Sequence, residues 1–266
     1  MRKLNGRIRL YLEFIVPKQY DKLLRKMNTA LIVEPRDMKR IPLIINHFLF
    51  TLGPNWKIVF YCGTGLKSKW SSKVNKEVEI RELYVSNLTA SQYSDLLKSK
   101  MLWDTLYGEF VLVFQTDAWI MNEPPYTIDY FLFRNKTYIG SNMCYKWKAI
   151  EFKTRFWNYN GGLSLRKRKD MVKIIDAFPP VATLDHAEHI EQSTLKNYPI
   201  ETYPEDVYFV EGCNRLGLEM GDCDEEFNLF SLHTIFYPIA FGTHKPSEYV
   251  KSELIKLYPD IQTAYM

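Results

Sequence analysis

A short apolar run near the middle of the chain, FVLVF at Phe110–Phe114, most constrains the fold. Its continuous β-branched and aromatic residues are typical of a central parallel strand that is covered on both faces. Three polar residues follow at once, Gln115, Thr116 and Asp117. Because open α/β sheets bind ligands at the carboxyl ends of their strands, Asp117 stands where a site would be built. The alternative, that Asp117 only caps a turn or the next segment, is equally consistent with this stretch alone.

The segments around this run alternate between strand-like and helix-like patterns. We expect strands at 30–34, 56–62, 78–85 and 109–116, and helices at 41–52 and 90–106. This alternation predicts an α/β fold in a single domain, with a mainly parallel, Rossmann-like sheet flanked by helices. Right-handed crossovers place the carboxyl ends of the parallel strands at one edge of the sheet. The residues expected at that edge are Glu34, Arg36, Gly63 and Asp117.

The composition excludes several classes of protein. Lys and Arg number 35 against 31 Asp and Glu, and this net charge of +4 is too small to indicate nucleic acid as the main partner. No segment approaches the roughly 20 apolar residues of a membrane-spanning helix, and the basic start of the chain resembles neither a signal peptide nor an anchor. The four cysteines lack zinc-knuckle or redox spacing. We therefore expect a cytoplasmic protein without a membrane span, and the sequence has no feature that sets its oligomeric state.

Three short motifs in the second half carry residue types that suit chemistry. They are Asn160-Gly161-Gly162 before Leu163–Arg166, the pair Glu205-Asp206, and His244-Lys245. The paired glycines indicate either a turn with positive φ or a very close approach of a ligand. Glu205 and Asp206 open a predicted helix, whose dipole is expected to lower a carboxylate pKa, but carboxylates there often only complement the dipole. His244 taken alone is equally consistent with a packed histidine.

Two further clusters are better explained without a ligand. Asp185, His186, Glu188 and His189 have metal-binding residue types. They lie in a polar stretch and lack the HExxH order, which favours a solvated loop. The basic run from Arg166 to Lys169 is typical of a solvated helix start.

The order of the motifs resembles that of an uncharacterised, glycosyltransferase-like family of the GT-A fold with members in large DNA viruses. The matching segments are Glu34-Pro35-Arg36, Phe114-Gln115-Thr116-Asp117, Asn160-Gly161-Gly162-Leu163-Ser164-Leu165-Arg166, Glu205-Asp206-Val207 and Gly242-Thr243-His244-Lys245-Pro246. They span most of the chain, from about residue 30 to residue 246. The order of the glycine and acidic motifs is also similar to that of inverting galactosyl- and N-acetylgalactosaminyltransferases.

This resemblance implies a nucleotide-sugar donor, with a UDP-sugar expected, and a glycan or protein acceptor. A divalent Mn²⁺ or Mg²⁺ would be held by Asp117 and His244, which match the last Asp of a DxD motif and a later His. Gln115 departs from that motif, because it stands where the first Asp would be and adds no charge. The residues implied on the donor side are Glu34, Pro35, Arg36, Gly63, Gln115, Thr116, Asn160, Gly161, Gly162, Arg166 and Lys245.

The resemblance also implies the catalytic roles and the organisation of the chain. Asp206 would be the base that takes the acceptor proton in an inverting transfer, and Glu205 would face acceptor or sugar hydroxyls. Arg166 and Lys245 would neutralise the leaving diphosphate. Residues 1–29 would form an arm, 30–120 a nucleotide-sugar-binding half, and 121–250 an acceptor and catalytic half.

Alternatives from other classes remain open at this point. Retaining chemistry would not need the base. A sugar nucleotidyltransferase has a similar sheet, although it normally carries a basic, glycine-rich loop after its first strand, unlike Glu34-Pro35-Arg36. A non-catalytic carbohydrate- or protein-binding module is consistent with the loss of charge at Gln115.

Overall fold

The computed structural model describes residues 27–121, 126–141, 160–184, 198–222 and 226–261. Within these residues the strands join into one nine-stranded sheet, in the order β3-β2-β1-β4-β7-β6-β8-β9-β5. Most of the strand pairings are parallel. The prediction of an α/β fold built on a mainly parallel sheet is confirmed.

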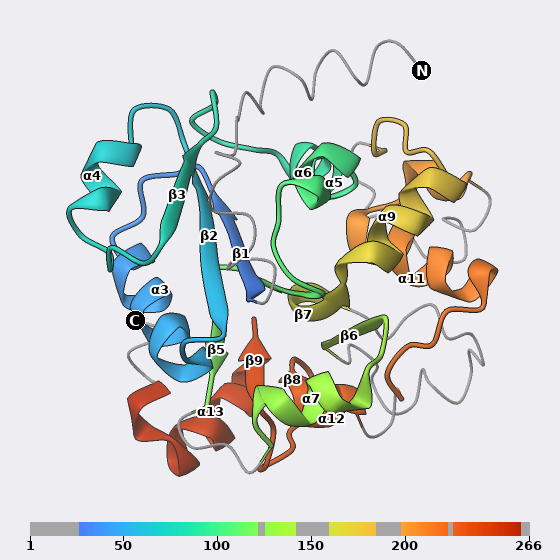
Figure 1. Cartoon of the computed structure of the whole chain (residues 1–266). Coiled ribbons are helices and arrows are strands. Elements are labelled where there is room, and N and C mark those ends of the chain that lie inside the picture. Colours follow the sequence, from blue (N-terminus) through green and yellow to red (C-terminus); the bar gives the residue numbers. More distant parts are fainter. Residues whose placement is uncertain (1–26, 122–125, 142–159, 185–197, 223–225, 262–266) are drawn as a thin grey trace.

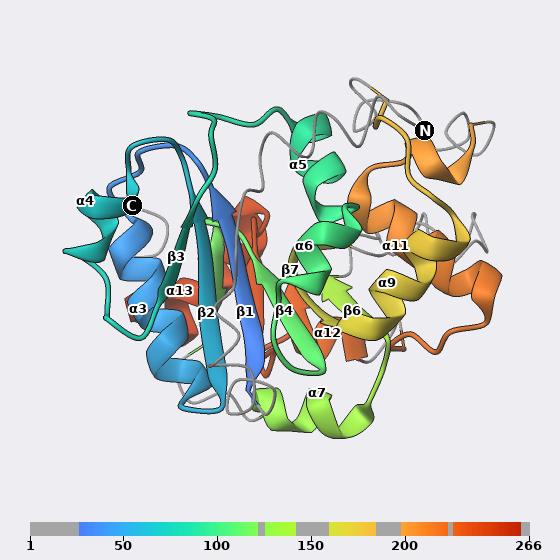
Figure 2. The same cartoon turned by 45° about the horizontal axis from the view of Figure 1, so that its top comes forward.

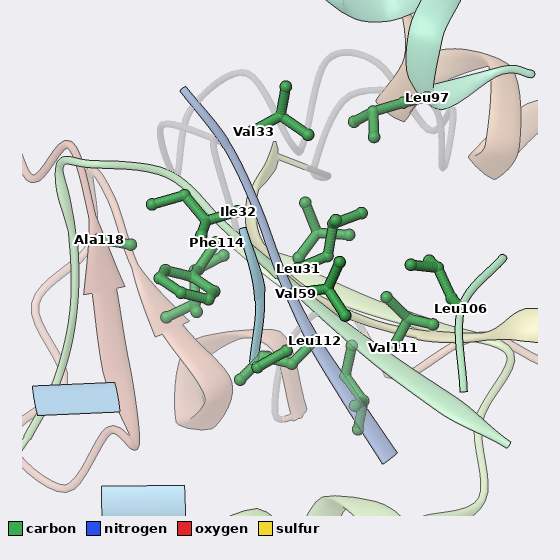
Figure 3. Close-up of a cluster of buried hydrophobic side chains, with 14 of the residues drawn as sticks. Leu31, Ile32, Val33, Val59, Leu97, Leu106, Val111, Leu112, Phe114 and Ala118 are labelled. Carbon is green, nitrogen blue, oxygen red and sulfur yellow. The ribbon is translucent and has the colours of Figure 1, made fainter. Parts of the chain in front are cut away.

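Four parallel strands form the first half of the sheet (Figure 1 and Figure 2). They are β1 (Asn28–Glu34), β2 (Trp56–Cys62), β3 (Glu79–Glu82) and β4 (Phe110–Phe114). All five residues of β4 are buried. Its side chains pack with those of β1 and β2 in a dense apolar cluster that includes Leu31, Ile32, Val59, Leu112 and Phe114 (Figure 3). The predicted strands are confirmed, although β3 is shorter than the predicted span of 78–85.

The other five strands are mostly shorter and change direction. They are β5 (Ala118–Ile120), β6 (Tyr138–Ser141), β7 (Asn160–Lys167), β8 (Ser231–Leu232) and β9 (Gly242–His244). β7 runs antiparallel to β4 and β6, whereas β8 lies parallel to β6 and β9. β5 follows β4 directly in the chain but pairs with β9. The sheet therefore curls, and the turn at Gln115–Asp117 connects its two halves.

The helices lie in two groups on either side of the strands (Figure 1 and Figure 2). One group contains α3 (Ile41–Leu52), α4 (Lys67–Ser71) and α13 (Glu248–Leu257); the other contains α5 (Ala90–Leu97), α6 (Lys100–Asp104), α9 (Arg168–Ala177) and α11 (Glu205–Leu216). The short helices α7 (Ile128–Arg134) and α12 (Glu226–Phe230) and the 3₁₀ turns Ile200–Thr202 and Pro259–Ile261 complete the described chain. None of the described helices has the length and apolar composition of a bilayer-spanning segment.

Two predicted elements differ from the structure. The helix expected at 90–106 is interrupted at Ser99, which has extended dihedrals, while the side chain of Lys98 is buried and donates to the Glu201 and Tyr203 carbonyls. The glycine pair does not form a positive-φ turn but lies within β7. The cluster from Asp185 to His189, most of the N-terminal arm and the segment between Met143 and Phe156 lie outside the described residues.

Candidate active site

The residues expected at the carboxyl edge of the sheet lie together. After β1, Arg36 donates to Glu34 through Nε (2.8 Å) and Nη2 (2.7 Å). Gly63, after β2, packs so closely on this turn that a Cβ there would lie 2.1 Å from the Pro35 carbonyl oxygen. The pKa of Arg36 is raised, first by its bond to Glu34 and in part by the charge of Asp117 after β4. The prediction that these turns share one edge is confirmed.

The imidazole of His244 meets the polar end of β4. Because β9 pairs with β5, His244 lies opposite Ala118 and next to the turn that joins β4 to β5. Its Nε2 is 3.1 Å from Asp117 Oδ1 and 3.1 Å from Gln115 Oε1. The ring is buried, while the Asp117 side chain is 38% exposed. The predicted convergence of Asp117 and His244 is present in the structure.

Asp117 is kept ionised by its neighbours. Burial alone would raise the pKa of its carboxyl, but the bond from His244 and the charges of His244 and Lys245 lower it overall. The Lys245 N–H donates to the Asp117 carbonyl at 3.2 Å, and Lys245 is exposed with a positive φ of 43°. Left-handed backbone is uncommon outside glycine. The tight turn at Lys245 therefore places this lysine beside the Asp117 carboxylate.

These side chains fit a divalent ion in the chemistry of their donor atoms. Two ligands that bind one ion at about 2.1–2.2 Å and at right angles lie about 3 Å apart. The 3.1 Å spacing of Asp117 Oδ1 and His244 Nε2 matches that requirement. The described residues contain no group of three or more His, Cys, Asp or Glu side chains that could hold a metal. Carboxylate and imidazole would thus supply two ligands, as in sites where substrate phosphates and water complete the shell of Mg²⁺ or Mn²⁺.

The His244 ring is held from behind by packing. Its backbone carbonyl accepts a hydrogen bond from His233 Nδ1 at 2.9 Å, and the two rings stack. Its own Nδ1 is buried and has no hydrogen-bond partner among the described residues. Ligating histidines usually donate this second N–H to an oxygen that fixes the ring. Here the neighbouring backbone and the His233 ring restrict its orientation.

A buried ion pair lies under the second part of the site. Arg166 is fully buried and donates to both carboxylate oxygens of Glu205, at 2.6 and 3.2 Å. Its Nε donates to Ser164 Oγ at 2.9 Å, and its guanidinium lies over the rings of Tyr138 and Phe209. Burial alone would lower the pKa of Arg166, but the Glu205 carboxylate raises it overall. The charges of Arg166 and Glu205 therefore neutralise each other inside the protein.

This pairing corrects two roles inferred from the sequence. Arg166 was expected to neutralise a leaving diphosphate, but its guanidinium is fully buried and donates to Ser164, Glu205 and the Gly161 carbonyl. Glu205 was expected to face acceptor or sugar hydroxyls, but both of its oxygens bind Arg166. A buried ion pair of this geometry holds elements together, because separating it leaves an uncompensated charge.

Asp206, the next residue, points a different way. Its Oδ1 accepts from the Val207 N–H at 2.8 Å, and its Oδ2 accepts from the Gly161 N–H at 3.3 Å. Burial, and then the charge of Glu205, raise the pKa of Asp206 from 3.8 to about 6. The expectation that the helix dipole lowers this pKa is wrong, because burial and the neighbouring carboxylate outweigh the dipole.

The glycine pair of β7 joins the two parts of the site. A Cβ on Gly161 would lie 2.4 Å from Glu205 Oε1 and 3.1 Å from the Asp206 Cβ. A Cβ on Gly162 would lie 2.1 Å from His244 Nε2. Only glycine leaves room for Glu205 and Asp206, at the start of α11, to approach position 161 of β7 and for the His244 imidazole to approach position 162. Close side-chain packing, not a special φ, explains the pair.

Other predicted residues support this arrangement. Asn160 Oδ1 accepts from the Gly162 N–H at 2.8 Å, and the Gln115 N–H donates to the Gly162 carbonyl at 2.9 Å. Thr116 is partly exposed in the turn between β4 and β5.

One residue at the site was missed by sequence reasoning. Tyr93 follows the apolar periodicity of its helix and was therefore interpreted as a packing residue. Its hydroxyl is hydrogen-bonded to the Gln115 side chain and lies within electrostatic reach of Asp117, Glu205 and Arg166. The only signal in the sequence was a phenol where the pattern required any apolar residue.

Comparison with solved structures found glycosyltransferases. The mannosyltransferase PcManGT from Pyrobaculum calidifontis, in complex with GDP-Man and Mn²⁺, is 10% identical with a TM-score of 0.47; the match covers 82% of this chain and 61% of that one. The glycosyltransferase GlyE of Streptococcus pneumoniae TIGR4 is 13% identical with a TM-score of 0.42, and its apo form 14% identical with a TM-score of 0.40. Each GlyE match covers 84% of this chain and 55% of that one. This chain thus spans less than two thirds of their length.

At the level of sequence, no curated protein matches this chain. One protein family does, and its profile aligns with residues 77–244. That segment is more than half of the chain and includes β4, the glycine pair, Asp206 and His244. The protein therefore belongs to the family described as "Protein of unknown function (DUF5672)".

Proposed function

We propose that this protein is an inverting glycosyltransferase that moves a sugar from a nucleotide-sugar to an acceptor hydroxyl. One observation carries the proposal. Adjacent glycines of β7 contact, on one side, a carboxylate with a pKa of about 6 and, on the other, an imidazole that binds Asp117. An ionised base and a carboxylate–imidazole pair are thereby held next to each other, as transfer from a sugar diphosphate requires.

Asp117 and His244 would hold Mn²⁺ or Mg²⁺ at the diphosphate. When bound, the ion supplies positive charge against the charge that develops on the leaving phosphate. Lys245 adds a second, exposed cation beside Asp117. Because Gln115 is neutral, Asp117 would be the one carboxylate offered to the ion, where a DxD motif would supply two.

Asp206 would act as the base. As the acceptor oxygen attacks the anomeric carbon, its proton passes to the carboxylate, and the bond from that carbon to the phosphate oxygen breaks. The configuration at the anomeric carbon inverts. A pKa of about 6 leaves the carboxylate ionised at neutral pH and more basic than an ordinary Asp. The N–H groups of Val207 and Gly161 fix its orientation.

The first half of the sheet would bind the nucleotide. The turn of Glu34, Pro35 and Arg36 and the turn at Gly63 lie at the same edge as Asp117. We assign a UDP-sugar as donor and place the glycan or protein acceptor on the side of residues 121–250.

A donor screen tests this function. The protein is incubated with UDP-sugars and GDP-sugars in Mn²⁺, in Mg²⁺ or in EDTA, and donor hydrolysis and transfer are followed by chromatography. We expect metal-dependent release of the nucleoside diphosphate, and an inverted anomer in the product by NMR. Asp117→Asn should abolish it, whereas Asp176→Asn, an exposed carboxylate paired with Lys100, should retain it.

Other results of the same screen would contradict the proposal. Release of pyrophosphate with formation of a nucleotide-sugar would identify a sugar nucleotidyltransferase. Donor or glycan binding without turnover would identify a binding module. Full transfer in EDTA or in Asp117→Asn would remove the ion from the mechanism.

A further inference from the structure

The helix that carries Tyr93 is fixed to the segment that carries the proposed base. Ser94 Oγ, adjacent to Tyr93, accepts from the Glu205 N–H at 3.3 Å. One turn later, Lys98 donates to the carbonyls of Glu201 and Tyr203 at 3.1 and 3.0 Å. These bonds join α5 to the start of α11. The Tyr93 side chain is thereby positioned relative to the base by two separate anchors.

The Tyr93 hydroxyl also lies next to Gln115, which contacts His244 of the proposed metal site. Gln115 Oε1 lies 3.1 Å from His244 Nε2, and the Gln115 side chain is also hydrogen-bonded to the Tyr93 hydroxyl. A phenol both donates and accepts hydrogen bonds, so the Tyr93 hydroxyl has the capacity for a second partner besides Gln115. A chain of contacts runs from Asp117 through His244 and Gln115 to Tyr93.

Four groups surround this phenol from the elements packed around it. The charges of Glu205, Arg166 and Asp117 act on it, and the Gln115 side chain is hydrogen-bonded to it. Burial and the charge of Glu205 raise its pKa well above the usual range, so Tyr93 stays protonated at every working pH. The residue as a whole is half-buried.

We propose that the Tyr93 hydroxyl binds a hydroxyl group of the transferred sugar and thereby helps to select the sugar. This rests on the proposed function. A donor sugar is bonded to the diphosphate at Asp117 and His244, and its anomeric carbon must face the acceptor at Asp206, so its ring spans the interval that Tyr93 borders. A neutral phenol with a proton to donate matches a sugar hydroxyl, whereas a diphosphate needs cations.

Calorimetry on Tyr93→Phe separates the sugar from the nucleotide. The titrants are UDP, GDP and the nucleotide-sugars UDP-glucose, UDP-galactose, UDP-N-acetylglucosamine and GDP-mannose, each with Mn²⁺. We expect the variant to bind the accepted nucleoside diphosphate like the wild type, and its sugar conjugate about 5–10-fold more weakly, as for the loss of one hydrogen bond. Tyr249→Phe, at an exposed tyrosine of α13 outside the proposed nucleotide-binding half, is the matched control and should change neither.

A series of monodeoxy donors sharpens this test. For the donor that lacks the hydroxyl bound by Tyr93, the wild type and Tyr93→Phe should bind equally. If the variant binds the full sugar conjugate as tightly as the wild type, the inference is overturned. Equal weakening of diphosphate and conjugate would also overturn it, because Tyr93 would then act only through Gln115. If the wild type binds no nucleotide-sugar at all, the proposed function fails together with the inference.

Discussion

The two halves of the sheet differ in the direction of their strands and in the surroundings of the charged side chains that they bury. The half made of β3, β2, β1 and β4 consists of parallel strands with a mostly apolar core, and its buried charged residues, Arg81 and Glu34, pair within that half with Glu79 and Arg36. The half that runs from β7 to β5 changes direction; Arg166 of β7 is buried against Glu205 of α11, and His244 of β9 is buried beside the polar turn after β4. Apolar packing tolerates small changes in shape, whereas each buried charge requires one specific partner. We therefore expect the first half to supply a firm edge and the second half to supply most of the groups of the proposed reaction at that edge.

The largest expected effect separates chemistry from stability in the second half. Asp206→Asn keeps the size of the side chain, and its single oxygen can still accept from one of the two N–H groups, of Val207 and Gly161, that bond the carboxylate. Turnover should fall by about 10²–10⁴-fold, the usual cost of losing a general base. Steady-state kinetics with the accepted donor measure this, with Asp176→Asn as the exposed Asp-to-Asn control. Turnover equal to that of the control would remove Asp206 from the reaction.

The pH dependence of the same variant follows from the raised pKa of Asp206. The folded state holds the proton up to about pH 6, whereas the unfolded chain releases it near 3.8. The contribution of this group to stability is therefore greatest at low pH and is lost as pH rises between these values. Below about pH 6, wild-type kcat/KM should fall tenfold per pH unit. Asp206→Asn should lack this loss of stability in thermal melts; a decline equal to that of the wild type contradicts the assignment.

The next effect concerns stability alone. Arg166→Met leaves the buried carboxylate of Glu205 without a partner and should lower the free energy of unfolding by about 3–5 kcal/mol. Urea denaturation measures the change. Lys100→Met, which breaks the exposed pair with Asp176, should change stability little. A second substitution, Glu205→Leu, should restore part of the loss; if Arg166→Met resembles Lys100→Met, the ion pair does not stabilise this half.

A smaller effect tests the contact between the halves of the site. Gly162→Ala places a methyl group against the His244 ring and should displace it. Mn²⁺ affinity by calorimetry should fall about 10–100-fold, as when the support of a ligating histidine is lost. Gly53→Ala, at a positive φ with nothing within 4 Å, should cost stability but leave Mn²⁺ affinity unchanged. Equal Mn²⁺ affinity in both variants would show that the space at Gly162 does not determine the position of the His244 imidazole.

The smallest effect is expected in the parallel half. Ile32→Val removes one methylene from the apolar cluster of Figure 3 and should cost about 0.5–1.5 kcal/mol. Because Ile32 contacts no group of the site in our scheme, kcat and KM should be those of the wild type. If Ile32→Val is fully folded but has altered kcat or KM, the carboxyl edge of the parallel half is less rigid than we propose.

The same contrast explains what the sequence could predict. The runs at 30–34 and 56–62 and the helix at 41–52 match the structure closely, because apolar periodicity reports burial directly. Motif order also brought Asp117 and His244 together correctly. The partner of Arg166, by contrast, depends on a helix that begins at Glu205, and no local pattern encodes that contact. Tyr93 was missed for the same reason, since a phenol on an amphipathic helix has the same periodicity whether it packs or binds.

The bond between Gln115 and His244 has a consequence for how the molecule is made. These residues are separated by 129 positions, and the imidazole lies on β9, which follows β7 and β8 in the chain. Contacts that close such long loops carry a high entropic cost and slow folding. During synthesis, the parallel half from β1 to β4 emerges before β9. Asp117 therefore acquires its partner His244 only when most of the chain has been made. A ligand of Asp117 and His244 therefore binds only the finished protein and favours it by mass action over any truncated or half-folded chain.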